Sequence, residues 1–124
     1  MPLTARLRDE ENERINNILK KLVALDYVPE LGGEIDSVLR GIGLDRQTLL
    51  DISAADLISH LENYNFDWAN AEIFADFVAS IAARLPESRF ALNEKSVAIY
   101  NYIQSESKTF SLTISGKITS LKNS

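Results

Sequence analysis

Apolar residues recur every three or four positions through most of this 124-residue chain, a spacing that is typical of amphipathic helices. The first apolar stripe begins at Leu3 and Leu7 and predicts one long helix over residues 3–25. Its later members are Ile15, Ile18, Leu19, Leu22 and Val23. Pro29 follows shortly, and because a proline ring disfavours the helical conformation in the residue before it, we expect a break at Val28.

Shorter helices are expected over residues 30–63. A second apolar stripe predicts a helix that ends at Gly41 and Gly43, because glycine readily adopts the left-handed conformation found after helices. The members of this stripe are Leu31, Ile35, Val38, Leu39 and Ile42. Asp45 and Ser53 are suited to accept hydrogen bonds from the exposed backbone N–H groups of helix N-termini. The helices that they would cap cover residues 46–51 and 54–63.

The pattern over residues 67–122 predicts longer helices. Asp67 is suited to cap a helix over residues 68–85, which Pro86 would end. Ser88 is suited to cap the next helix, whose apolar residues lie on two sides. One side holds Leu92, Ile99, Tyr102 and Ile103, and the other holds Phe90 and Val97. A helix that is apolar on two sides packs between neighbours, so we expect this helix to be central.

Residues 109–115 carry two conflicting patterns. Apolar and polar residues alternate there and several are β-branched, which favours a strand. The apolar residues of the wider segment, however, are spaced as in a helix, at Phe110, Ile114, Ile118 and Leu121. A lone strand in a helical chain would leave its backbone groups unpaired, so we interpret the segment as helical and expect Gly116 to weaken it. The whole pattern predicts an all-α single domain of six or seven helices.

The composition of the chain excludes several kinds of covalent link and metal site. The chain has no cysteine and one histidine, which excludes disulfides, thiolate zinc sites and any site that needs two imidazoles. We find neither an apolar leader behind a basic start nor a run of about 18 apolar residues, so we expect a cytoplasmic protein that does not bind a membrane.

The net charge of −5 is concentrated in residues 26–63, which hold eight acidic and two basic residues. This charge is unsuited to nucleic acid. We interpret it as a solvated acidic surface, and an acidic patch that docks a basic partner is the alternative.

The residues that begin and end the predicted helices resemble those of a known family. The segments that carry this resemblance are Gly43-Leu44-Asp45, Leu49-Leu50, Ser53-Ala54-Ala55-Asp56-Leu57, Leu92, Ile99-Tyr100, Ser107-Lys108-Thr109-Phe110-Ser111-Leu112 and Lys117-Ile118. In these positions the chain resembles a small bacterial family of unknown function with tetratricopeptide (TPR)-like helical hairpins. The resemblance implies stacked hairpins over residues 67–122, and it implies no catalytic residue or cofactor. Because no TPR repeat of about 34 residues is evident, we expect stacked hairpins rather than a repeat array.

Asp56 and His60 are the residues that could support catalysis. They lie four positions apart on one predicted helix, so their side chains share a face. A Ser-His-Asp site would also need a placed nucleophile, and the chain has no G-x-S-x-G motif. We therefore expect that the protein is not an enzyme, and a hydrolase that uses these two residues is the weakest alternative. The chain also lacks metal-binding and nucleotide-binding motifs, so we expect no cofactor.

Aromatic residues are the candidates for contact with a partner, because tryptophan and tyrosine combine a large apolar area with a polar tip. Two groups qualify, namely Tyr64, Phe66 and Trp68 in a predicted loop, and Tyr100 and Tyr102 on a predicted helix. The two tyrosines of the second group diverge by about 200° at 3.6 residues per turn, so one groove can hold only one of them. The alternative is that all five residues simply anchor the core.

Our leading hypothesis is a non-enzymatic protein–protein interaction module with an unidentified protein partner. The long helix over residues 3–25 could in addition pair with its copy in a homodimer. The alternative is a small helical DNA-binding or regulatory protein, although no predicted helix carries the several basic residues on one face that a recognition helix needs.

Overall fold

The computed structural model describes the backbone of residues 3–25 and 32–123 and the side chains of residues 10–25 and 33–123. Within these ranges the chain forms seven α-helices, one short 3-10 helix and no β-strand. The elements are α1 (Leu3–Leu25), α2 (Gly32–Leu39), η2 (Arg40–Ile42), α3 (Arg46–Asp51), α4 (Ala54–Asn63), α5 (Trp68–Arg84), α6 (Arg89–Ser107) and α7 (Leu112–Lys122). The prediction of an all-α protein with six or seven helices is confirmed. The expected break at Pro29 and the stripe position Leu31 lie outside the described residues.

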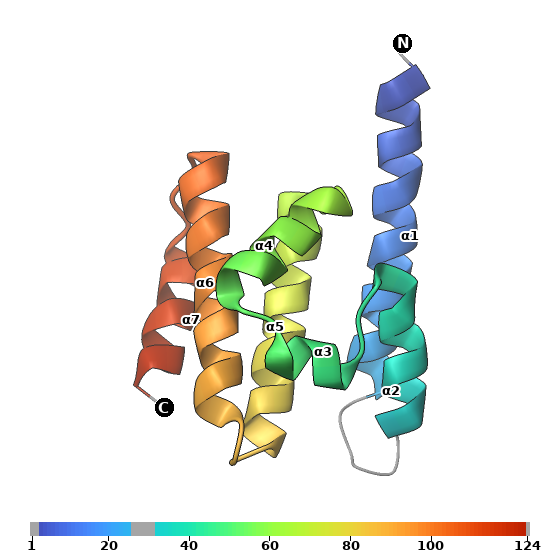
Figure 1. Cartoon of the computed structure of the whole chain (residues 1–124). Helices are drawn as coiled ribbons and strands as arrows, with labels where there is room; N and C mark the ends of the chain where they lie inside the picture. The colour runs from blue at the N-terminus through green and yellow to red at the C-terminus, as the bar shows by residue number, and fades with distance from the viewer. Residues whose placement is uncertain (1–2, 26–31, 124) are drawn as a thin grey trace.

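Helices α5 and α6 form an antiparallel pair at the centre of the molecule (Figure 1). Helix α6 also packs against α4 and α7, while α1 packs against α5 and α2. The core is formed by apolar side chains from all of these helices, among them Ile15, Leu19, Leu39, Leu57, Phe74, Val78, Leu92, Ile99 and Ile103. The central position that the two-sided pattern predicted for α6 is thereby confirmed.

Side-chain caps determine where four of the helices begin, because each cap supplies an acceptor to a backbone N–H group that has no partner inside the helix. These hydrogen bonds run from Thr48 N to Asp45, from Asp56 N to Ser53, from Asn70 N to Asp67, and from Ile114 N to Ser111. The helices predicted over residues 46–51 and 54–63 are confirmed at both ends. The helix predicted over residues 68–85 ends one residue earlier, at Arg84.

The two glycines near the end of η2 have different roles. Gly43 follows η2 in the left-handed conformation, with φ of 74°, and confirms the predicted stop. Gly41 does not end a helix, and that expectation was wrong. It lies inside η2, where a Cβ atom would stand 2.9 Å from the end of the Ile18 side chain of α1, so glycine leaves room for that side chain. Ser88 precedes α6 as expected, but its side chain makes no capping hydrogen bond.

The C-terminal segment 109–115 is helical only from Leu112 onward. Lys108 adopts the left-handed conformation, with φ of 57°, and ends α6. Ser111 N then donates to the Gln104 side chain at 2.7 Å. The backbone of the segment between α6 and α7 is therefore bonded to a side chain of α6 and does not continue a helix. The helical interpretation is therefore wrong for the first three residues of the segment and confirmed for the rest.

Helix α1 is 23 residues long, and its N-terminal end extends past the ends of the other helices (Figure 1). The homodimer through this helix stays a prediction, because the side chains of Leu3 and Leu7 lie outside those described. Neither α1 nor any other described helix combines the length and the apolar character that are needed to cross a membrane.

Asp36, in the middle of α2, bonds to Arg46 at the start of α3. Its carboxylate accepts hydrogen bonds from Arg46 N at 2.9 Å and from the Arg46 guanidinium at 3.0 and 3.2 Å. These hydrogen bonds, which outweigh the opposing effect of burial, lower the pKa of Asp36 below its usual value of 3.8. The ionised carboxylate therefore stabilises the fold.

We expect Asp36→Asn to lower the free energy of unfolding by about 1–2 kcal/mol at pH 7. Because the folded pKa is lower than the unfolded pKa, the contribution of Asp36 is present above the unfolded value and is lost as the pH falls through the folded value. The difference between wild type and variant should therefore shrink below about pH 4. Urea unfolding at pH 7 and at pH 3 measures it, and an equal difference at both pH values would contradict the assigned ion pair.

Candidate functional site

A hollow of about 370 Å³ lies where α1, the end of α4, the start of α5 and α6 meet. It is lined by Asn12, Glu62, Asn65, Phe66, Asp67, Trp68 and Tyr102, and we call it the aromatic hollow. Three of the five aromatic residues predicted to contact a partner are therefore brought together here. The fold assembles them from a loop, a helix N-terminus and the face of a distant helix.

Trp68 and Tyr102 form the aromatic wall of this hollow. Their ring centroids are 5.7 Å apart and their planes make an angle of 64°, which is an edge-to-face contact. Trp68 is the first residue of α5 and is 41% exposed. Burial raises the pKa of Tyr102, and the negative charges of Glu62 and Glu106 raise it further. The carboxylate of Glu62 therefore lies close enough to the Tyr102 hydroxyl to favour its protonated form.

Phe66 connects the aromatic hollow to the core. Its ring packs edge-on against Phe74, with the centroids 6.0 Å apart and the planes at 71°. Phe74 is fully buried and packs in turn against Phe77. Asn65, just before Phe66, has φ of 59°, a left-handed conformation that asparagine adopts more readily than most residues. This turn directs the chain from α4 toward the core, so Phe66 anchors the hollow.

Asn70 holds α1 against the rim of the hollow. Its Nδ2 group donates to Asn12 O at 2.9 Å and to Asn12 Oδ1 at 3.2 Å, and its Oδ1 atom accepts from Asn16 Nδ2 at 3.0 Å. Asn12 Oδ1 also accepts from Asp67 N at 2.8 Å. Asn70 is almost completely buried, and nothing in the sequence pattern indicated this role for a polar residue on an apolar helix.

The rim of the aromatic hollow is acidic. Glu62 and Asp67 line it, and Glu11 accepts a hydrogen bond of 3.4 Å from Asn65. Among the lining residues that the structure describes, none is basic. Arg14 approaches Glu11 to 4.0 Å, but its guanidinium donates to Gly41 O at 2.9 Å. The arrangement therefore favours a positively charged group in the hollow.

Tyr64 and Tyr100 take no part in this hollow. The Tyr64 ring stacks on His60, with the centroids 4.6 Å apart. Tyr100 is only 2% exposed and its hydroxyl donates to Asp76. Burial, followed by this hydrogen bond, raises the pKa of Tyr100. The prediction that one groove can hold only one of Tyr100 and Tyr102 is confirmed.

His60 is bonded to the end of η2. Its Nε2 atom lies 2.7 Å from Ile42 O, and because a carbonyl oxygen can only accept, this nitrogen carries a proton and donates. Asp56 lies in the first turn of α4, where its N–H group is bonded to the Ser53 cap. In the described part of the chain, no three His, Asp or Glu side chains gather as ligands of a metal ion would.

We expect His60→Ala to lower the free energy of unfolding by about 1–2 kcal/mol, because Ile42 O loses its donor and the Tyr64 ring loses its stacking partner. Urea unfolding followed by circular dichroism measures the change. Ser59→Ala, at an exposed position of the same helix, is the control and should stay within about 0.5 kcal/mol of wild type. Equal stability of the two variants would mean that the His60 hydrogen bond contributes nothing.

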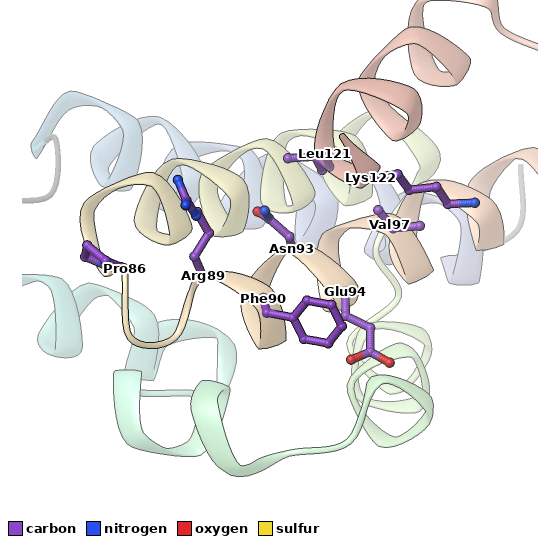
Figure 2. Close-up of a pocket in the computed structure, with 8 residues that line it drawn as sticks. All are labelled: Pro86, Arg89, Phe90, Asn93, Glu94, Val97, Leu121 and Lys122. Carbon is purple, nitrogen blue, oxygen red and sulfur yellow. The ribbon is translucent and has the colours of Figure 1, made fainter. Parts of the chain in front are cut away.

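A second hollow, of about 490 Å³, lies between α6 and α7 (Figure 2). Its lining residues are Pro86, Arg89, Phe90, Asn93, Glu94, Val97, Leu121 and Lys122, and we call it the α6–α7 hollow. Phe90 is 83% exposed, so the expectation that it lies on a second buried side of α6 was wrong. Helix α7 reaches the Val97 end of this hollow and leaves the Phe90 turn uncovered (Figure 2). The lining carries charges of both signs.

Lys117 ties α7 to α5. Its ammonium group donates to Glu72 at 2.7 Å and to Asp76 at 3.2 Å, and it lies 5.8 Å from the centre of the Tyr100 ring. Burial alone would lower the pKa of Lys117, but the hydrogen bonds and charges of the two carboxylates outweigh it and raise the pKa. Sequence reasoning missed this cluster, since its partners are far apart in the chain and no local motif marks them.

Comparison with known proteins adds no relative. No protein-family model, curated protein or solved structure matches the chain. The functional evidence therefore comes from the hollows themselves. The aromatic hollow is distinguished by an exposed tryptophan and by charged lining residues of a single sign, whereas the α6–α7 hollow has neither feature.

Proposed function

We propose that the protein is a non-enzymatic protein–protein interaction module, made of TPR-like stacked helical hairpins, that binds a partner protein at the aromatic hollow. The observation that carries this proposal is the exposed Trp68 ring, which lies beside Tyr102 in the aromatic hollow. Tryptophan and tyrosine dominate the energetic centres of interfaces, since their rings bury a large area at little cost in side-chain entropy.

The succession of helices supports the hairpin part of the proposal. Helices α5, α6 and α7 run in alternating directions, and α6 packs against both of the others (Figure 1). Stacked helices of this kind offer binding surfaces made by residues from several neighbouring helices. The aromatic hollow is such a surface, because its lining comes from α1, α4, α5 and α6.

The alternative functions have less support. A DNA-binding protein needs a positive face toward the phosphate backbone, whereas the charged side chains that line the aromatic hollow are acidic. In a hydrolase at Asp56 and His60, only Nδ1 of the imidazole could act as the base, because His60 Nε2 donates to Ile42 O.

The test compares partner capture by the wild-type protein and by two variants. Trp68→Ala removes the exposed ring of the aromatic hollow. Phe90→Ala removes the exposed ring of the α6–α7 hollow and is the matched control. Because both rings are exposed, we expect each change to alter the free energy of unfolding by at most about 1 kcal/mol, which urea unfolding verifies.

Each purified protein is immobilised and exposed to an extract of the cells that express it, and the bound proteins are quantified by mass spectrometry. We expect proteins that the wild type and Phe90→Ala retain equally and that Trp68→Ala depletes by about tenfold or more, as loss of an interface anchor should. The proposal is overturned if wild type retains nothing beyond what Trp68→Ala retains.

A further inference from the structure

We infer that the group bound in the aromatic hollow is an arginine side chain from a basic segment of the partner protein. This inference rests on the proposed function and adds the chemical identity of the bound group. It is carried by three properties of the hollow, namely its aromatic wall, a carboxylate held beside that wall, and its size.

The aromatic wall suits a planar cation. Trp68 is partly exposed and meets Tyr102 at 64°, so the two rings form a corner rather than a flat stack. Tryptophan attracts cations over its ring face more strongly than other aromatic residues do, and arginine is the commonest protein cation in such contacts. A guanidinium group can stack on the indole while its edge remains free for hydrogen bonds.

A carboxylate stands beside these rings. Glu62 lines the hollow together with Trp68 and Tyr102, which places its negative charge next to the aromatic wall. An ionised carboxylate offers about four acceptor sites, so Glu62 retains the capacity to accept N–H groups from a guanidinium. The structure thus presents a ring face and a charged acceptor side by side.

Other side chains fit this combination less well. An apolar side chain would cover the rings but would strip water from Glu62 without replacing its hydrogen bonds. Lysine is a compact and strongly hydrated charge that cannot stack as a plane. A hollow of about 370 Å³ lies near the lower end of the range for ligand pockets, about 300–1,000 Å³, which suits one side chain. The acidic residues 26–63 would further attract a basic segment.

The chain supplies its own probe for a test, because Trp68 is its only tryptophan. Three peptides of glycine and serine differ at one central residue, which is arginine, lysine or citrulline, the neutral analogue of arginine. We expect the arginine peptide to change the tryptophan emission saturably at low salt. It should bind about tenfold more tightly than the citrulline peptide, as loss of a charge-assisted hydrogen bond predicts, and more tightly than the lysine peptide.

Two variants connect this binding to the carboxylate. Glu62→Gln removes the negative charge while keeping a side chain of nearly the same size, and it should weaken the arginine peptide about tenfold. Glu94→Gln makes the same charge change in the α6–α7 hollow and should alter binding by less than about twofold, because exposed charges at a distance are screened. Circular dichroism confirms that both variants fold.

The possible failures can be told apart. If the arginine peptide gives no response, if the citrulline peptide binds equally well, or if Glu62→Gln has no effect, the assignment of arginine is overturned. Partner capture that still depends on Trp68 would then leave the proposed function in place. Absence of Trp68-dependent capture would instead overturn the proposed function itself.

Discussion

Replacing Phe74 with alanine is expected to lower the free energy of unfolding by about 3–5 kcal/mol, the cost typical of truncating a large aromatic residue in a core. Phe74 is fully buried in α5, and its ring lies 6.0 Å from that of Phe66 and 6.4 Å from that of Phe77. Truncation removes both contacts and leaves a cavity that the surrounding helices can close only in part. Because domains are stable by only about 5–15 kcal/mol, the variant should unfold at much lower urea concentration.

The same substitution should disturb the aromatic hollow. Phe66 loses the surface on which it packs, so the loop before α5 is released and the environment of Trp68 changes. Urea unfolding and the tryptophan emission spectrum measure the two effects. Phe90→Ala makes the same chemical change at an exposed position and should stay within about 0.5 kcal/mol of wild type. Equal costs for both variants would contradict the packing assigned to Phe74.

The helices could be predicted closely because their signals are local. A cap such as Asp45 or Ser53 bonds to a backbone group three residues later, so the necessary residues stand together in the sequence. Similarly, the period of 3.6 residues was enough to separate Tyr100 from Tyr102. In contrast, the alternating pattern of residues 109–115 could not show that Gln104, seven residues before Ser111, would bond to the connection.

The aromatic hollow could be predicted only in its parts. Phe66, Trp68 and Tyr102 were each candidates, but the contact between Trp68 and Tyr102 depends on how α5 and α6 pack against each other. A periodic pattern identifies an apolar side of a helix and does not show whether a neighbour covers it. Phe90 was misjudged for this reason, because α7 covers α6 near Val97 and leaves the earlier turn exposed.

Asn70→Asp is expected to lower the free energy of unfolding by about 3–5 kcal/mol at pH 7, the range for a buried charge that has no compensating partner. The change adds almost no volume, but it replaces an amide that donates with a carboxylate that only accepts. At present the Asn70 amide donates to both oxygens of Asn12, at 2.9 and 3.2 Å. A carboxylate oxygen in that position would face two acceptors inside a nearly water-free contact between α1 and α5.

The pH dependence of this variant distinguishes charge from shape. Burial beside acceptors should raise the pKa of the new carboxyl group in the folded state. A folded pKa above the unfolded one means that the destabilisation is present at high pH and diminishes as the pH falls through the folded pKa. Once protonated, the group can donate to Asn12 again. We therefore expect the deficit at pH 7 to be smaller at pH 4.5 in urea unfolding.

Asn17→Asp is the matched control for this prediction. It makes the same substitution at an exposed position of α1, where the new charge stays in water and Lys21 follows one helical turn later. Its stability should stay within about 0.5 kcal/mol of wild type at both pH values. Because Asn70 also holds the Asn12 rim of the aromatic hollow, Asn70→Asp should weaken the arginine peptide while Asn17→Asp does not. A deficit in Asn70→Asp that is independent of pH would show that α1 is held to α5 by shape alone, not by the donor arrangement seen at Asn70.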